Sequence, residues 1–189
     1  MRKSESRKAK FLGELINNTM SFPFNIVEVG VYRGILTKSL QALYPTSTYY
    51  MVDRWKACDE SGKMYDGVGQ EIWDQHYQEV VDLFKDVPHT YIVREDSAKA
   101  ADDFSDYTVD FCYLDAGHTY EAVKADIDAW LRTISVGGIL AGHDYSGHSS
   151  KIGVVQAVQE AFGEDFSFNK GKRIWWHVVK QRRGEDEGR

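Results

Sequence analysis

Residues 25–34, which read NIVEVGVYRG, decide how the fold of this chain is interpreted. Residues 25–31 are rich in β-branched side chains and break at Gly30, a pattern typical of a buried strand. Residues 35–43 then carry apolar side chains at helical spacing and stop before Pro45. A strand that passes through a glycine turn into a helix is the first unit of a parallel α/β sheet.

The same alternation of strand and helix continues along the chain. Further strands are predicted at 48–52, 89–94, 109–114 and 139–142, with a terminal hairpin formed by 166–168 and 174–179. Helices are predicted at 71–85, 98–104, 120–134 and 153–162, and the glycine pair 137–138 is expected to turn the chain. Strands spaced for helical crossovers predict a doubly wound parallel sheet.

The two ends of the chain are predicted to lie outside this sheet. Residues 1–10 are charged and expected to fray, whereas apolar residues within 11–16 predict a short amphipathic helix. We therefore predict an N-terminal helical extension (1–24), an α/β domain (25–180) and a disordered tail (181–189). Residues 54–72 are predicted to form a long loop or lid, and 142–151 either a flap or an ordinary loop.

Composition narrows the class of protein. The chain has 189 residues, which suits one domain, and a formal net charge of −6, which disfavours a nucleic-acid partner. Cys58 lies in a polar stretch and Cys112 in an apolar one, so two free thiols in a reducing compartment are expected. No run reaches the roughly 18 apolar residues of a membrane span. These features predict a cytoplasmic protein without a membrane partner.

Acidic residues follow four of the predicted strands: Asp53, Asp96, Asp115 and Asp144. The carboxyl ends of parallel strands meet at one edge of a sheet, where ligands bind near the point at which the strand order reverses. The sequence therefore predicts a functional site that gathers these carboxylates.

The first strand-to-helix turn carries Glu28, Gly30 and Gly34. Gly30 is expected to permit a tight turn with close approach to a ligand, and Gly34 to let the next helix sit close to the strand. The dinucleotide fingerprint G-x-G-x-x-G is absent, and Glu28 is expected to repel a pyrophosphate. A cationic or zwitterionic ligand fits this turn better, with an ordinary β-turn-α corner as the alternative.

Two more strand ends could contact a nucleoside. Asp53 comes 23 residues after Gly30, at the place where an acid accepts hydrogen bonds from ribose hydroxyls, although a solvated aspartate is the alternative. This position is compatible with S-adenosylmethionine (SAM) or NAD. Asp96 and Ser97 could bind the adenine amine, cap the next helix, or do both.

Residues 114–126 (LDAGHTYEAVKAD) and 137–145 (GGILAGHDY) carry a family resemblance. The chain resembles class I SAM-dependent O-methyltransferases grouped with the macrolide sugar O-methyltransferases, over roughly residues 26–162. The resemblance implies a mainly parallel seven-stranded sheet with an antiparallel last strand. It also implies that SAM is held by Glu28, Gly30, Gly34, Asp53, Asp96 and Ser97. Arg33 and Asp115 are further candidate cofactor contacts, a solvated arginine being the alternative for Arg33.

The resemblance also suggests a metal and a base. In such relatives the aspartate matching Asp115 and an acid pair at the next strand end bind a divalent metal, and the histidine matching His118 is the proposed base. In this chain His143 replaces the first acid of that pair, and only Asp144 keeps a carboxylate. The candidate metal ligands are thus Asp115, His143 and Asp144, and the histidine weakens the case for Mg²⁺ or favours a softer metal. His143 is a second candidate base, and His118 could instead orient the next helix.

The function expected from these residues is methylation of a hydroxyl on a small sugar-like or natural-product-like molecule. A positioned base is needed to take the hydroxyl proton, and histidine changes protonation near neutral pH. An NAD-dependent oxidoreductase and a non-catalytic nucleoside-binding protein are the alternatives. A small-molecule acceptor is the expected partner, and homo-oligomer formation is left open.

Overall fold

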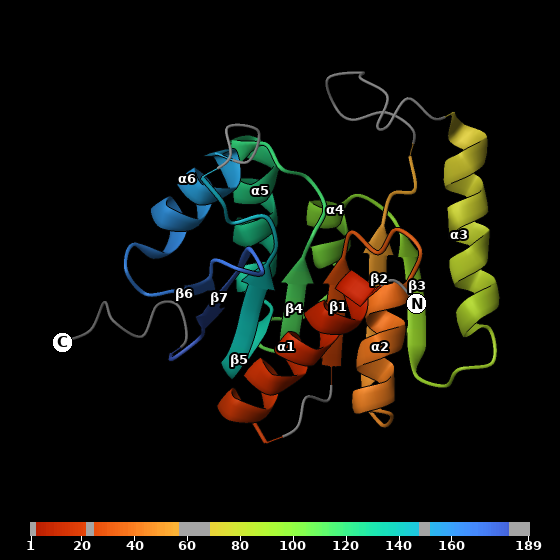
Figure 1. The fold of residues 1–189 in the computed structure, drawn as a ribbon, viewed down its shortest axis with the longest axis horizontal. Coiled ribbons are helices and arrows are strands. Elements are labelled where there is room, and N and C mark those ends of the chain that lie inside the picture. Colours follow the sequence, from red (N-terminus) through yellow and green to blue (C-terminus); the bar gives the residue numbers. More distant parts are fainter. Residues whose placement is uncertain (1–2, 22–24, 57–68, 148–151, 182–189) are drawn as a thin grey trace.

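The computed structural model describes residues 3–21, 25–56, 69–147 and 152–181. Its helices and strands alternate along the chain as the sequence predicts (Figure 1). In order they are α1 (Lys3–Thr19), β1 (Asn25–Val29), α2 (Ile35–Leu43), β2 (Thr48–Asp53), α3 (Gln70–Phe84), β3 (Thr90–Arg94), α4 (Ser97–Ala101), β4 (Val109–Leu114), α5 (Tyr120–Leu131), β5 (Ile134–Gly142), α6 (Ile152–Phe162), β6 (Ser167–Asn169) and β7 (Ile174–Val178).

The strands form a seven-stranded sheet in the order β3-β2-β1-β4-β5-β7-β6. Strands β1 to β5 pair in parallel, whereas β7 runs antiparallel to β5 and to β6. This confirms the predicted doubly wound, mainly parallel sheet with an antiparallel last strand. The chain builds outward from β1 to β3 and then returns to β4 on the other side of β1. The carboxyl ends of β1 and β4 therefore flank the point where strand order reverses.

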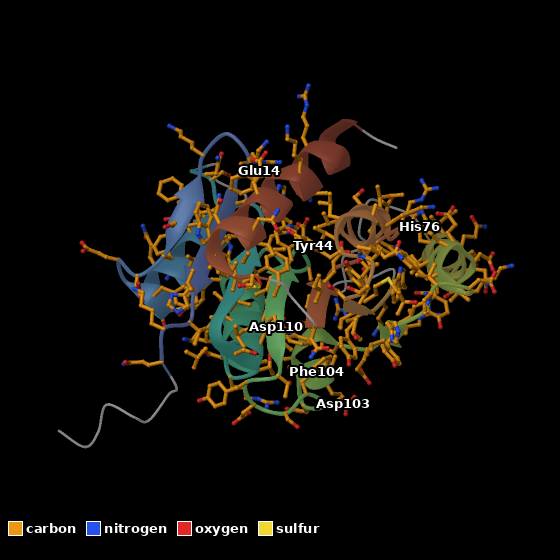
Figure 2. All side chains as sticks on the ribbon, turned by 90° about the horizontal axis from the view of Figure 1, so that it is seen from below. Glu14, Tyr44, His76, Asp103, Phe104 and Asp110 are labelled. Carbon is orange, nitrogen blue, oxygen red and sulfur yellow. The ribbon has the colours of Figure 1, made fainter. Side chains whose placement is uncertain are left out.

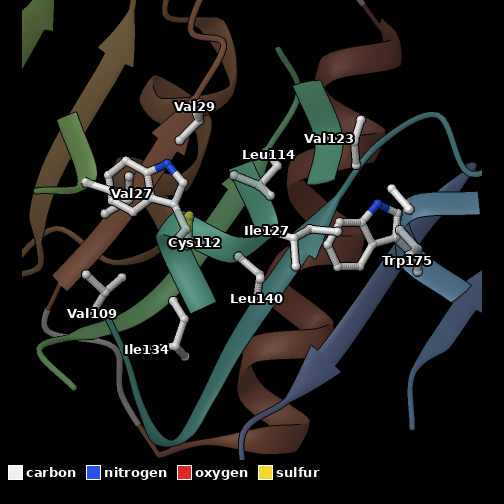
Figure 3. Packing of buried hydrophobic residues seen from close by; sticks show 14 of the residues in the cluster. Val27, Val29, Val109, Cys112, Leu114, Val123, Ile127, Ile134, Leu140 and Trp175 are labelled. Carbon is white, nitrogen blue, oxygen red and sulfur yellow. The ribbon is translucent and has the colours of Figure 1, made fainter. Parts of the chain in front are cut away.

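Both faces of the sheet are buried, because neighbouring side chains of a strand point to opposite faces. Ile26 packs with α1 and α2, whereas Val27 and Cys112 pack with Trp130 of α5. Figure 3 shows part of the cluster that contains Val27 and Cys112. In it, Leu140 and Ile127 also lie between the sheet and its helices. Figure 2 shows Glu14 of α1 and Tyr44, which follows α2, on the side of the sheet opposite to Phe104.

The N-terminal helix begins earlier than predicted. Residues 3–10 belong to α1, although their charge suggested a frayed segment. The reason is that α1 packs on α2: Ala9, Leu12 and Ile16 are buried in the cluster that includes Leu40 of α2. The burial of an amphipathic face stabilises a helix more than its local propensity does. Whether residues 1–24 are an extension separate from a domain at 25–180 stays a prediction.

The glycine pair at 137–138 does not turn the chain as predicted, because both residues lie inside β5. The helix before them is correspondingly shorter and ends at Leu131. A Cβ on Gly138 would lie 2.9 Å from the carbonyl oxygen of Asp110, and the β4–β5 register shifts between Val109 and Phe111. Glycine is thus needed here for close strand packing at an irregularity of the sheet.

Several predictions concern segments outside the described residues. The lid at 54–72 and the flap at 142–151 are described only in part, and Cys58 and residues 182–189 of the tail are not described. Cys112 is a free, buried thiol, as predicted. Among the described helices, none combines the length and the apolar character that crossing a bilayer requires.

Candidate functional site

The site lies at the carboxyl edge of the parallel strands. β1 and β2 end level with each other, since Val29 pairs with Val52, and β4 ends beside them at Leu114. The residues that follow β1, β2 and β5 include Tyr32, Trp55 and Asp144, whose φ angles are 55°, 44° and 58°. Such left-handed backbone in non-glycine residues costs of the order of 1–3 kcal/mol each and clusters at functional sites.

Gly30 makes the tight turn that its place after β1 predicts, with a φ of 88°. A Cβ at this residue would lie 2.2 Å from the carbonyl oxygen of Asp115. Gly30 therefore allows the loops after β1 and β4 to touch, and close approach of a ligand is not needed to explain it. Gly34, with a φ of 71°, leaves room for the ring of Phe84, 2.9 Å from its missing Cβ. The space that a Cβ would fill at Gly34 is thus occupied by side chains of α3.

Glu28 is buried beneath the first turn. Its carboxylate accepts a hydrogen bond of 2.9 Å from the backbone N–H of Thr37 and another from the Thr37 hydroxyl. Burial raises the pKa of Glu28 to about 8, although these hydrogen bonds act in the opposite direction. Burial thus favours the neutral form of this side chain, and repulsion of a pyrophosphate by Glu28 stays a prediction. Direct contact of Glu28 with SAM stays a prediction.

Asp53 connects the loops that follow β1 and β2. One carboxylate oxygen accepts the backbone N–H of Tyr32 and the other that of Trp55, both at 2.8 Å. The Trp55 indole N–H donates to the carbonyl of Tyr32, also at 2.8 Å. Burial raises the pKa of Asp53. Each carboxylate oxygen has a second lone pair, so this oriented carboxylate fits the ribose hydroxyls of a nucleoside such as that of SAM.

Three other candidate cofactor contacts have partners within the protein. Asp96 is the N-cap of α4 and accepts the N–H of Ala98 at 3.1 Å, which confirms the predicted capping role. The Ser97 hydroxyl accepts the indole N–H of Trp130 at 3.0 Å. Arg33 pairs with Glu79 at 2.5 and 3.1 Å. The cofactor roles of Asp96, Ser97 and Arg33 stay predictions.

The structure brings the predicted catalytic and metal-binding residues into one cluster. Nε2 of His118, which follows β4, lies 2.8 Å from Oδ2 of Asp144, which follows β5. Nδ1 of His143 lies 3.4 Å from Oδ1 of Asp115 and 3.5 Å from Oδ1 of Asp144. Two carboxylates and two imidazoles thus alternate at the ends of neighbouring strands.

Two cations that the sequence analysis did not select complete this cluster. Nζ of Lys8, from α1, lies 2.8 Å from Oδ2 of Asp115, and a guanidinium nitrogen of Arg173, from the β6–β7 turn, lies 3.3 Å from Oδ1 of Asp144. Burial opposes ionisation of Asp115, but His143 and Lys8 outweigh it and lower its pKa. Burial likewise opposes protonation of His143, and its two carboxylate neighbours outweigh that effect and raise its pKa. The ionised cluster is therefore stabilised by internal pairing.

A small cavity of about 10 Å³ adjoins the cluster, which is close to the volume that about one water needs. Asp115, His118 and His143 line it, together with Asp126 of α5. Asp126 is buried, and although it ends the quoted segment 114–126, the sequence analysis did not select it as a site residue. It follows Val123 by three residues on the buried face of α5, so an acid on an apolar helix face was the available signal.

The donors at this site do not fit a resident divalent metal. Ligand atoms of Asp115, His118 and Asp144 do lie within 4.8 Å of one another. Both carboxylates, however, already face a permanent cation, Lys8 or Arg173. A hard divalent ion prefers anionic oxygen ligands and is repelled by ammonium and guanidinium groups beside them. The predicted metal ligands Asp115, His143 and Asp144 are adjacent, but their charge is already balanced.

Comparison with known proteins identifies a family model, described as a methyltransferase domain, that matches residues 27–145. This match begins in β1 and ends directly after Asp144, so it includes both parts of the site. A curated relative, the uncharacterized protein y4gI of Sinorhizobium fredii, is 26% identical over 172 residues. The alignment covers 84% of this chain but only 18% of that relative, which is therefore several times longer than the matched part.

Solved methyltransferases share the fold. The SAH-bound methyltransferase PaMTH1 of Podospora anserina superposes with a TM-score of 0.66 at 8% identity, covering 92% of this chain and 78% of its own. CalS11, a TDP-rhamnose 3′-O-methyltransferase of calicheamicin biosynthesis, has a TM-score of 0.61 at 18% identity, covering 97% and 82%. At such identities these likenesses establish the fold alone.

Proposed function

The chain belongs to the methyltransferase-domain family, and from this premise we propose that it transfers the methyl group of SAM to a hydroxyl oxygen of a small molecule. The observation that carries the proposal is the pairing of His118 with Asp144 beside Asp115, next to the turn that follows β1. A histidine oriented by a carboxylate is suited to take a proton from a hydroxyl group.

The cofactor would lie along the carboxyl ends of β1 and β2. Asp53 would accept hydrogen bonds from its ribose hydroxyls, because its carboxylate is already oriented by Tyr32 and Trp55. When bound, SAM supplies an electrophilic methyl group on a sulfonium. The loops after β1 and β4 touch at Gly30 and Asp115, so a cofactor at the first turn is adjacent to the His118 cluster. Positioning two reactants in this way supplies much of the rate of a transfer reaction.

His118 would act as the base. With Nε2 facing Asp144, a neutral imidazole that carries its proton on Nε2 has its lone pair on Nδ1. Nδ1 would then take the proton of the acceptor hydroxyl, whose oxygen would receive the methyl group that SAM supplies. The imidazolium that results is stabilised by Asp144 at 2.8 Å. Asp144 would thus compensate the new charge of the base.

The proposed acceptor class follows from a protein that shares the fold and from the charge of the chain. CalS11, which shares the fold, methylates a sugar nucleotide according to its description, and this supports a hydroxylated small molecule here. The net charge of −6 disfavours a nucleic-acid acceptor.

Isothermal titration with SAM and with S-adenosylhomocysteine tests the cofactor, and transfer of a labelled methyl group to a panel of sugars and phenols tests the reaction. We expect both cofactor forms to bind and at least one hydroxylated acceptor to be labelled. Binding without labelling would support the non-catalytic alternative. Binding of NADH with no binding of either SAM form would overturn the proposal.

A further inference from the structure

Helix α1 positions Lys8 beside Asp115. Its ammonium lies 2.8 Å from Oδ2 of Asp115 and 5.7 Å from the centroid of the Tyr113 ring, and its side chain is only 15% exposed. Ala9 and Leu12, which follow it in α1, are buried against the rest of the molecule. Lys8 is therefore a held, largely desolvated cation and differs from a surface lysine whose ion pair is weak.

The charges around Lys8 balance without a metal. Asp115 faces the ammonium of Lys8 at 2.8 Å, and Asp144 faces the guanidinium of Arg173 at 3.3 Å, so each carboxylate has a cationic partner. His143 stands between the two carboxylates at 3.4 and 3.5 Å, so both of them face an imidazole, whereas a hard cation prefers oxygen ligands. Each of the two carboxylates therefore has both a cationic side chain and an imidazole within 3.5 Å.

We propose that Lys8 occupies the cation position of this carboxylate pair, so that the site works without a divalent metal and excludes one. Lys8 is then a positioning residue, because it holds the Asp115 carboxylate and, through it, the His143 ring. The inference concerns the cation at the site and holds whatever methyl acceptor the protein uses. The two proposals can fail separately, since metal binding is measured without SAM or acceptor.

The test is a titration with Mn²⁺ alone, followed by electron paramagnetic resonance, on the whole chain. We expect the wild type to bind Mn²⁺ weakly and Lys8→Met to bind it at least tenfold more tightly, because the variant removes the ammonium but retains a long apolar side chain. The gain should disappear in the double variant Lys8→Met, Asp115→Asn. Lys10→Met is the matched control: Lys10 lies in the same helix, is exposed, and is 3.9 Å from Glu14.

Two outcomes would overturn the proposal. One is a wild type that binds Mn²⁺ as tightly as Lys8→Met in a manner that depends on Asp115. The other is a folded Lys8→Met variant that gains no affinity. Circular dichroism verifies that α1 is retained, and Lys8→Gln replaces the methionine variant if the helix is lost. Lys8→Arg, which keeps the charge, is expected to bind Mn²⁺ as weakly as the wild type.

Discussion

The two halves of the site are held together by different means. At the ends of β1 and β2, Asp53 accepts backbone N–H groups from residues close to it in the fold, Tyr32 and Trp55. At the ends of β4 and β5, Asp115 and Asp144 are held by side chains from other segments. We call these the backbone half and the ion-pair half.

The difference shows how a fold can retain one half of a site while the chemical properties of the other half change. A carboxylate bound by backbone N–H groups changes its surroundings only if the chain path changes. A carboxylate bound by side chains acquires new properties from one substitution in a remote helix or turn. The ion-pair half is therefore where substrate and metal preference are expected to vary, on a scaffold whose backbone half is retained.

The largest expected effect tests the ion-pair half. His118→Gln should lower the rate of methyl transfer by about 10²–10⁴-fold, because a positioned base is lost, while the affinity for SAM stays unchanged. Turnover with labelled SAM and titration calorimetry measure the two quantities. His89→Asn is the control, since His89 is exposed at the opposite edge of the sheet, before β3. Equal losses of affinity and rate would place His118 in cofactor binding instead.

The second effect concerns Glu28 at the first turn. Its pKa is about 8 in the folded protein and 4.5 in an unperturbed side chain, so the folded state retains a proton that the unfolded state loses. The free energy of unfolding should fall as pH rises from 4.5 to 8, by at most about 1.4 kcal/mol per pH unit from this group. Glu28→Gln keeps an acceptor for Thr37 and should remove this dependence.

Urea denaturation at pH 5 and pH 8 measures the effect of Glu28. The stability gained by Glu28→Gln over the wild type should be larger at pH 8 than at pH 5. An equal difference at both values would show that Glu28 titrates in its usual range and would count against its neutral state at pH 7.

The third effect tests the backbone half. Asp53→Ala leaves the N–H groups of Tyr32 and Trp55 without their carboxylate acceptor and should lower the free energy of unfolding by about 1.5–3 kcal/mol, in addition to weakening SAM binding. Chemical denaturation and calorimetry are the measurements. Asp82→Ala, on the exposed face of α3, serves as the control. A weakened SAM affinity with unchanged stability would assign Asp53 to the ligand alone.

The smallest effect separates the two roles predicted for Asp96. Asp96→Asn keeps an N-cap for α4 and should change stability by only a few tenths of a kcal/mol, whereas Asp96→Ala should cost about 1 kcal/mol. If Asp96 also binds the adenine amine, both variants should weaken SAM binding. Unchanged affinity in both would limit Asp96 to capping.

Local patterns predicted most of the fold and the location of the site. The strand before Gly30, the helix from Ile35 and the acids at strand ends follow from periodicity and turn chemistry, which act between neighbours in the chain. The predictions for 1–10 and 137–138 were wrong because packing decided them. Ala9 is buried against the rest of the molecule, and Gly138 packs on β4. Neither contact has a local signature.

By itself, the sequence determined that this chain builds a parallel sheet with carboxylates and His118 at one edge. The alternation of strands and helices along the chain, and the residues at which the strands end, follow from patterns between neighbouring residues. Only the tertiary structure decided the state of those groups. It brought Lys8 to Asp115 across 107 residues of chain, buried Glu28 so that its pKa rises to about 8, and placed Arg173 beside Asp144. Burial and distance set the charge of an ionisable group, and both depend on how distant segments pack.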